Sequence, residues 1–353
     1  MTRPVEVLPR SDLARWDSFV LSHELGTAYH TSAWRHVIER AYGHRPMYLI
    51  IDDGAGKIRA GLPLFLAKSR FMSARLVCVP AAQACDPLVS NQADYDRIVA
   101  YALAFMKQHH IESLELRTTE RFRLDSHRFG RRLNGYHCSI LDLGRDLEAI
   151  EQSLHKDSIR RRIKHARHSG LQTVVGHSLA DVKAFYDLHV QLRKRYGLLP
   201  QPYEFFRSLW QIMSRDQRID ILHATFNGRI ISSALLLKYK DTVVVEYSAT
   251  RLDARHLGAS PFLLWEAICR AKSAGYKRFD LGRTADDNQS LARFKARWGT
   301  RHHTLSYYFI PDCGQTTMIR QNEAVKRMMS RVMHQAPASW CQLMGRVLFR
   351  HVV

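Results

Sequence analysis

The chain has 353 residues, which is enough for two domains of ordinary size, and its 53 Lys and Arg against 33 Asp and Glu give a formal charge of +20. Such a surface attracts anions such as nucleic acid, acidic lipid headgroups or phosphorylated substrates, while six widely spaced cysteines argue against a zinc ribbon or a dense disulfide framework and favour a reducing cytoplasm. There is no apolar signal-peptide stretch and no run near the ~18 apolar residues that span a bilayer, so we expect a protein that is soluble or lies on a membrane surface.

The first half of the chain is predicted to fold as a mixed α+β domain. Apolar, β-branched segments and one helical segment follow one another: strands at 46–52, 57–67 and 74–80, a helix at 94–110, and strands at 111–119 and 135–143.

A basic segment, "LHKDSIRRRIKHARHSG" (154–170), separates the two halves. Read as a helix, it places Ile159, Ile163 and Ala166 on one face, with six Lys and Arg between Lys156 and Arg167. Such a charge run fits either a solvated helix face or a phosphate-binding site, and both interpretations stay open.

The second half contains the clearest strand pattern. Two helices are expected between 179 and 213, followed by strands at 219–226, 229–239 and 242–250, a helix within 255–275, a strand at 276–282, a helix at 288–298 and a strand at 304–310. Asn227-Gly228 predicts a type I′ hairpin, because both residues tolerate positive φ. Ser260 is expected to cap the helix within 255–275, with Pro261 at its first position.

The two halves resemble each other. "GKIRAGLPLF" aligns with "GRIISSALLL", and "ALAFMKQHHIESLELR" aligns with "AICRAKSAGYKRFDLG", with apolar residues matched at most positions. This indicates an internal duplication, although two unrelated halves could share the order by chance. Each half suits a mixed α+β domain of about 150 residues.

Two segments of the second half could bind a ligand. In "RHLGAS" (255–260), Gly258 lets a backbone approach a ligand, and the amides of the following helix end can bind an anion, although a plain turn would look the same. In "FDLGRTADDNQSLARFKARWG" (279–299), a strand ends in Gly282 and Arg283, as at the rim of a site, before a helix that presents Phe294 and Lys295.

Five stretches together resemble the FemAB/FemX-like proteins, which consist of two tandem GNAT-like (acyl-CoA N-acyltransferase) domains. They are "TAYHTSAWRHVIERAYGHRPMYL", "RRRIKHARHSGL", "HLGASPFLLWEAI", "GYKRFDLGRTADDN" and "RFKARWG". The chain looks closest to the branch that accompanies exosortase (PEP-CTERM) exopolysaccharide loci in Gram-negative bacteria. The resemblance covers roughly residues 25–310, and Arg255-x-x-Gly258-x-Ser260 is similar to the GNAT pattern Arg/Gln-x-x-Gly-x-Gly/Ala.

The resemblance implies an α+β fold with mixed sheets flanked by helices, and an N-acyltransferase without a tightly bound cofactor. Fem proteins take an aminoacyl group from aminoacyl-tRNA for an amine of a peptidoglycan precursor, whereas related proteins use acyl-CoA, so the donor stays open. We expect a phosphorylated or lipid-linked precursor of the cell envelope or of an exopolysaccharide as acceptor. tRNA would be a partner if the donor is aminoacyl-tRNA, although only ordinary helices fit where some Fem proteins carry a long helical arm. The alternatives are an acyl-CoA-dependent acetyltransferase of a small molecule and a non-catalytic basic module for nucleic acid or anionic polymer.

The resemblance and the chemistry of acyl transfer together assign candidate site residues. Lys295 is expected to stabilise the oxyanion that forms when an amine attacks an ester or thioester, and Glu246 or Asp280 to accept the proton. The candidate donor-binding residues are Arg255, Gly258, Ser260, Arg283 and Phe294. The candidate acceptor phosphate-binding residues are Arg161, Lys164 and Arg167.

Each of these assignments has a structural alternative. Lys295 could be an exposed helix lysine and Arg283 a surface ion-pair partner, while Glu246 or Asp280 could belong to a structural ion pair, with the substrate itself moving the proton. The histidines match no familiar metal pattern, so no metal is expected.

The last forty residues carry a basic amphipathic pattern. The apolar residues at helical spacing are Met329, Val332 and Met333, then Trp340, Leu343, Met344, Val347 and Leu348. Residues 318–353 could lie on an anionic membrane, placing the protein in the cytoplasm and peripherally at the inner membrane, or could dock the same face on the protein. The expected domains are 1–145, 146–312 with the active site, and a helical tail at 313–353.

Overall fold

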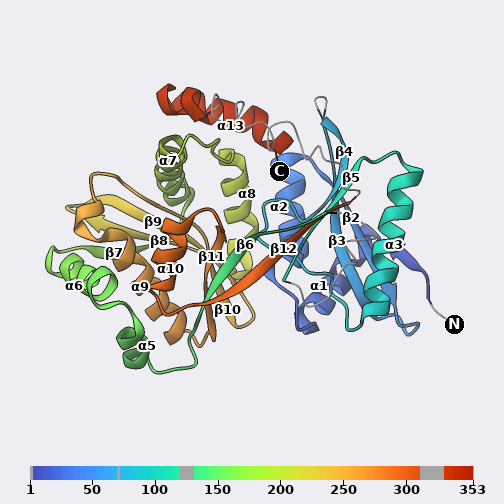
Figure 1. Cartoon of the computed structure of the whole chain (residues 1–353), viewed down its shortest axis with the longest axis horizontal. Helices are drawn as coiled ribbons and strands as arrows, with labels where there is room; N and C mark the ends of the chain where they lie inside the picture. The colour runs from blue at the N-terminus through green and yellow to red at the C-terminus, as the bar shows by residue number, and fades with distance from the viewer. Residues whose placement is uncertain (1–2, 70–71, 120–130, 311–329, 353) are drawn as a thin grey trace. The chain divides into compact units, whose positions relative to one another are not determined.

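The computed structural model describes residues 3–69, 72–119, 131–310 and 330–352 (Figure 1). Contacts divide the chain into two compact units. Unit 1 comprises Met1–Tyr136, Thr304–Glu323 and Arg350–Val353, and unit 2 comprises His137–His303 and Ala324–Phe349. The borders among the described residues therefore fall inside strands β6 (Arg131–Asp142) and β12 (Arg301–Ile310) and inside the last turn of helix α13 (Ala338–Val352). The domain limits at 145 and 312 stay a prediction.

Unit 1 is a mixed sheet with helices. The strand order is β1 (Val5–Val7), β2 (Arg45–Asp52), β3 (Ile58–Ser69), β4 (Met72–Cys78), β5 (Ser113–Thr118) and the end of β12. Its helices are α1 (Leu13–Ser22), α2 (Ser32–Tyr42) and α3 (Gln92–Gln108). β4 and β5 pair in parallel, and the other neighbours are antiparallel.

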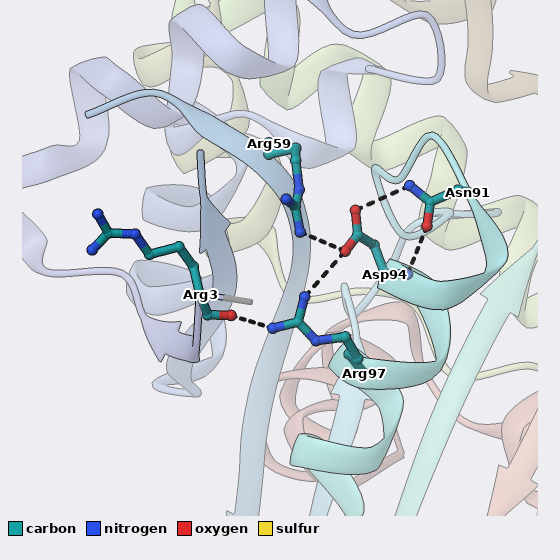
Figure 2. Close-up of polar contacts among 5 residues, drawn as sticks. All are labelled: Arg3, Arg59, Asn91, Asp94 and Arg97. Carbon is teal, nitrogen blue, oxygen red and sulfur yellow. Dashed lines mark hydrogen bonds and ion pairs between the residues drawn. The ribbon is translucent and has the colours of Figure 1, made fainter. Parts of the chain in front are cut away.

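A polar network fixes the beginning of α3 (Figure 2). The Asn91 side chain caps the helix by accepting a hydrogen bond from the backbone N–H of Asp94 at 2.9 Å. The Asp94 carboxylate is almost completely buried and forms ion pairs with Arg59 at 2.7 Å and with Arg97 at 3.4 Å. Arg97 also donates to the Arg3 carbonyl oxygen. The network therefore connects α3 with β3 and with the chain before β1.

Unit 2 repeats this architecture. Its strand order is β6, β11 (Arg278–Ala285), β10 (Thr242–Thr250), β9 (Arg229–Tyr239), β8 (Ile219–Phe226) and β7 (Gln172–Gly176). The helices are α5 (Leu147–Ser153), a π-helical turn (Lys156–Arg160) that continues into α6 (Arg161–His168), α7 (Leu179–Arg195), α8 (Tyr203–Met213), α9 (Ala259–Ser273), α10 (Gln289–Ala296) and α13 (Ala338–Val352).

Helices cover the unit 2 sheet, so the middle of its strand β9 is buried. α9 and α7 both pack on β8, β9 and β10, while α6 packs on α9 and α8 on α7. Residues 231–237 of β9 are all buried. The hairpin before β9 has φ values of 48° at Asn227 and 73° at Gly228, which confirms the expected turn.

The start of α9 differs from the sequence-based expectation. The helix begins at Ala259, its N-cap is Gly258 and no side chain caps it, so the prediction that Ser260 caps the helix is wrong. Pro261 is consequently the third helical residue. That position tolerates proline, because the first N–H groups of a helix have no partner within it.

The two units share one register at the parallel strand pair. In unit 1 the last paired residues are Val77 and Glu115, and in unit 2 they are Val244 and Asp280. In the sequence alignment of the halves, Glu115 matches Asp280 and Arg117 matches Gly282. This common register supports the internal duplication.

The loop after β4 folds back over the end of this strand pair in unit 1. The Cys85 backbone N–H donates to the Arg117 carbonyl oxygen at 2.8 Å. The buried Arg117 guanidinium donates to the Ala82 carbonyl oxygen and to Glu115, both at 2.9 Å. The chain itself therefore occupies this position in unit 1.

Candidate active site

The parallel pairing of β10 with β11 stops after three residue pairs, and polar residues gather where it stops. β10 shifts its register against β9 between Val245 and Tyr247, so Glu246 lies at a bulge. In β11, Gly282 has a φ of 82°, and a Cβ on it would lie 2.9 Å from the Val245 carbonyl oxygen. Only glycine combines this conformation with this close approach.

Lys295 projects from α10 to this point. It is 5% exposed, and its Nζ donates to the carbonyl oxygens of Gly282 at 2.6 Å and Arg283 at 3.1 Å. Burial lowers the pKa of Lys295 from 10.5 to about 8, against the opposing effect of nearby Asp280. The alternative of an exposed helix lysine is therefore wrong.

The two candidate proton acceptors have different surroundings. Asp280 is 7% exposed, and its Oδ1 accepts a hydrogen bond from the Gly282 backbone N–H at 2.8 Å, so this carboxylate stabilises the positive-φ turn. Glu246 is half-buried beside Tyr247. Burial, and then the charge of Glu246, raise the pKa of the Tyr247 hydroxyl. Arg283 is exposed and close enough to affect the pKa of both Tyr247 and Lys295.

A hydrogen-bond chain that sequence reasoning missed leads to Tyr247. His189 Nε2 lies 2.7 Å from Gln201 Oε1, and Gln201 Nε2 donates to the Tyr247 hydroxyl at 3.2 Å. Burial lowers the pKa of His189 to about 3, so the ring is neutral and Nε2–H is the donor to Gln201. Arg193 lies beside this chain, and burial lowers its pKa to about 10. Nothing in the spacing of these residues indicates their contact.

A histidine pair near Lys295 was also missed. His137 Nδ1 lies 2.9 Å from Asp286 Oδ1, and its ring centroid is 4.8 Å from that of His302. His302 Nδ1 is 3.3 Å from the Ser139 hydroxyl. Burial, followed by the charges of His137 and Lys295, lowers the pKa of His302, which favours the neutral ring at pH 7. The pair joins strands β6 and β12, which a single sequence cannot align.

The candidate donor loop lies against the basic helix. Arg255 is exposed and Ser260 half-buried. Gly258 has a φ of 73°, and a Cβ on it would lie 2.7 Å from the Arg162 carbonyl oxygen of α6. The close approach at Gly258 is therefore made by the protein's own backbone. Phe294 packs edge-on against Trp298, with 6.1 Å between ring centroids, and contacts the core.

The candidate phosphate-binding residues lie on the outer side of α6. Ile159, Ile163 and Ala166 are buried, which confirms the expected apolar face. Arg161, Lys164 and Arg167 are exposed. The Arg161 guanidinium is 3.9 Å from Asp157, and that of Arg167 is 3.0 Å from Glu266 of α9. The contacts thus define two groups, one around Lys295 and one made of α6 with the Arg255 to Gly258 turn.

Comparisons with known proteins agree with this architecture. Residues 153–296 match the family model described as an acetyltransferase (GNAT) domain, so unit 2 carries the GNAT segment. No curated protein matches the chain.

Several solved structures have a similar fold. A crystal structure of FemX is 13% identical, with a TM-score of 0.69 over 90% of this chain and 100% of that chain. The C-terminal domain of a putative lysylphosphatidylglycerol synthetase from Agrobacterium fabrum is 15% identical, with a TM-score of 0.56 over 92% of this chain and 96% of that chain. A tandem GNAT protein from the clavulanic acid biosynthesis pathway is 12% identical, with a TM-score of 0.52 over 86% and 98%. The predicted mixed α+β, GNAT-like fold is confirmed.

Proposed function

We propose that the protein is a cytoplasmic N-acyltransferase that moves an acyl or aminoacyl group onto an amine of a cell-envelope or exopolysaccharide precursor. The observation that carries this proposal is the buried Lys295 ammonium at the end of the β10 and β11 pairing, inside the segment that matches a GNAT domain. Two of the three N–H groups of the ammonium bind the Gly282 and Arg283 carbonyl oxygens, and the third is assigned to a substrate oxygen.

The proposed reaction is acyl transfer through a tetrahedral intermediate. The amine nitrogen forms a bond to the carbonyl carbon of the donor, and the carbonyl oxygen becomes an oxyanion that Lys295 stabilises. The C–S bond of a thioester or the C–O bond of an ester then breaks, and the leaving group takes the proton that the amine gave to the carboxylate. Glu246 and Asp280 are the two candidate proton acceptors, and Asp280 also holds the Gly282 N–H.

The remaining site residues are assigned to binding. Arg255 and Ser260, at the beginning of α9, would hold phosphates of the donor, while Gly258 lets this turn pack against the Arg162 carbonyl oxygen. Arg283 would orient a phosphate or carboxylate, and Phe294 would keep α10, and with it Lys295, in place by packing on Trp298. Arg161, Lys164 and Arg167 would bind phosphates of the acceptor.

Two donors fit the proposal. GNAT acetyltransferases use acyl-CoA, whereas the FemX resemblance favours aminoacyl-tRNA with a phosphorylated or lipid-linked precursor as acceptor. A further structural neighbour is named as a lysylphosphatidylglycerol synthetase, which supports aminoacyl transfer to an envelope component.

The experiment compares the two donors with one matched pair of variants. Transfer of labelled acyl groups from acetyl-CoA and from aminoacyl-tRNA to an amine-bearing, nucleotide-linked peptidoglycan precursor is measured for the full chain. Lys295→Met should reduce the rate with the true donor about a hundredfold or more. Lys272→Met is the control, because Lys272 Nζ also donates to a backbone carbonyl, that of Leu143 at 2.8 Å, outside the site. Equal rates for both variants would overturn the assignment of Lys295.

A further inference from the structure

Exposed apolar side chains gather on one part of unit 2. Among the described residues, eleven large apolar side chains are exposed, and six of them belong to residues 196–198 and 332–347. These six are Tyr196, Leu198, Val332, Trp340, Leu343 and Val347. We call this set the tail surface.

The two segments of the tail surface are in direct contact. A Cβ on Gly345 of α13 would meet the Pro200 carbonyl oxygen, and a Cβ on Gly197 would lie 2.9 Å from the Cα of Ser330. α13 accordingly runs close to α7 and the segment that follows it (Figure 1). The six exposed side chains therefore belong to one continuous region of unit 2.

One face of α13 is docked and another remains in solvent. Cys341, Gly345 and Phe349 are buried, which accounts for helix docking on the protein. Trp340, Leu343 and Val347 recur at i, i+3 and i+7, so they share a different face, and they are 37%, 54% and 44% exposed. α13 therefore docks on the protein through one face, and the membrane-binding alternative stays a prediction for the other. Met329 lies outside the described residues.

The charge of this part of the chain is uniformly positive. Residues 324–353 contain five Lys and Arg and no Asp or Glu. Arg346 lies on α13 beside the apolar face. Lys194 lies close enough to Cys341 for its charge to lower the pKa of the thiol, against the larger effect of burial. None of the helices in the described ranges is long and apolar enough to cross a membrane.

We propose that the tail surface binds in the interface of an anionic lipid bilayer. Trp340, Leu343 and Val347 would enter the headgroup boundary, while the flanking cations would meet lipid phosphates. A second copy of the chain is a poorer occupant of the tail surface. A symmetric contact would bring the cations of residues 324–353 against the same cations of the other copy, and this segment contains no Asp or Glu to pair with them.

Sedimentation with vesicles tests the proposal with the full chain. The wild type should bind vesicles that contain phosphatidylglycerol and should bind vesicles of phosphatidylcholine alone much more weakly. Leu343→Asp should reduce partitioning to the anionic vesicles at least about tenfold, because it places a charge of the wrong sign in the interface. Leu21→Asp is the matched control, since Leu21 is 62% exposed on α1 of unit 1 and should leave binding unchanged.

Two further measurements separate the alternatives. Trp340 fluorescence, isolated as the difference between the wild type and Trp340→Phe, should shift to shorter wavelength with anionic vesicles. The molar mass in solution of the wild type and Leu343→Asp should agree. The proposal is overturned if the wild type does not bind anionic vesicles, or if Leu343→Asp binds them as well as Leu21→Asp does. It is also overturned if the only effect of Leu343→Asp is to convert a dimer into monomers. None of these results depends on turnover, so the membrane proposal and the acyltransferase proposal fail separately.

Discussion

Replacement of Gly258 by alanine should destabilise unit 2 more than replacement of Gly275, at the other end of α9. Both glycines have positive φ, 73° and 83°, which costs an L-residue about 1–2 kcal/mol. At Gly275 nothing lies within 4 Å of the new Cβ, so that cost is the whole effect. At Gly258 the Cβ would lie 2.7 Å from the Arg162 carbonyl oxygen, and overpacking adds about 1–3 kcal/mol.

The difference between the two variants isolates the contact between α9 and α6. Urea unfolding followed by circular dichroism should give a loss of about 2–5 kcal/mol for Gly258→Ala and about 1–2 kcal/mol for Gly275→Ala. Amide hydrogen exchange of α6 should accelerate only in Gly258→Ala. Equal losses would refute the reasoning, because they would show that the backbone of α6 moves away at no cost.

Three further changes give distinct outcomes. Since burial lowers the pKa of Lys295 to about 8, kcat/KM should fall as pH rises above about 8, and the residual activity of Lys295→Arg should lack this fall. The folded-state pKa of His189 is about 3, below its ordinary 6.5, so the unfolded chain takes up this proton at a higher pH than the folded chain does. The free energy of unfolding should therefore decrease below pH 6.5 by up to about 1.4 kcal/mol per pH unit. The urea midpoint of His189→Phe should fall less steeply with decreasing pH than that of the wild type. Asp94→Ala should lose roughly 1–3 kcal/mol in thermal unfolding and Asn91→Ala about 0.5–2 kcal/mol, and no loss for Asp94→Ala would contradict the network in Figure 2.

Local patterns predicted most of the regular structure in both units. The hairpin at Asn227 and Gly228 depends on neighbouring residues, and its strands at 219–226, 229–239 and 242–250 match β8, β9 and β10. The elements that were not predicted, β1, α1, α2, β7 and α5, lie near the beginning of each half. The strands among them, β1 and β7, are edge strands too short to show a clear apolar pattern, and tertiary pairing decides such segments.

The candidate site was only partly accessible from the sequence. Lys295 was singled out through its place after Phe294, yet its burial and its bonds to the Gly282 and Arg283 carbonyl oxygens depend on how α10 packs on β11. The contact between Gln201 and Tyr247 joins residues 46 positions apart. No local pattern encodes such a contact, because it depends on how a loop packs on a distant strand.

One position in the alignment of the two halves differs in a way that should decide which unit binds a ligand. Where unit 2 has Gly282, unit 1 has Arg117, whose guanidinium bonds the Ala82 carbonyl oxygen and whose backbone carbonyl accepts from the Cys85 N–H. A ligand entering there would have to break the Arg117 bonds to Ala82 and Glu115 and expose a buried guanidinium. The chain should consequently take one donor molecule per polypeptide. Calorimetric titration should therefore give a stoichiometry of one, although the fold is present twice.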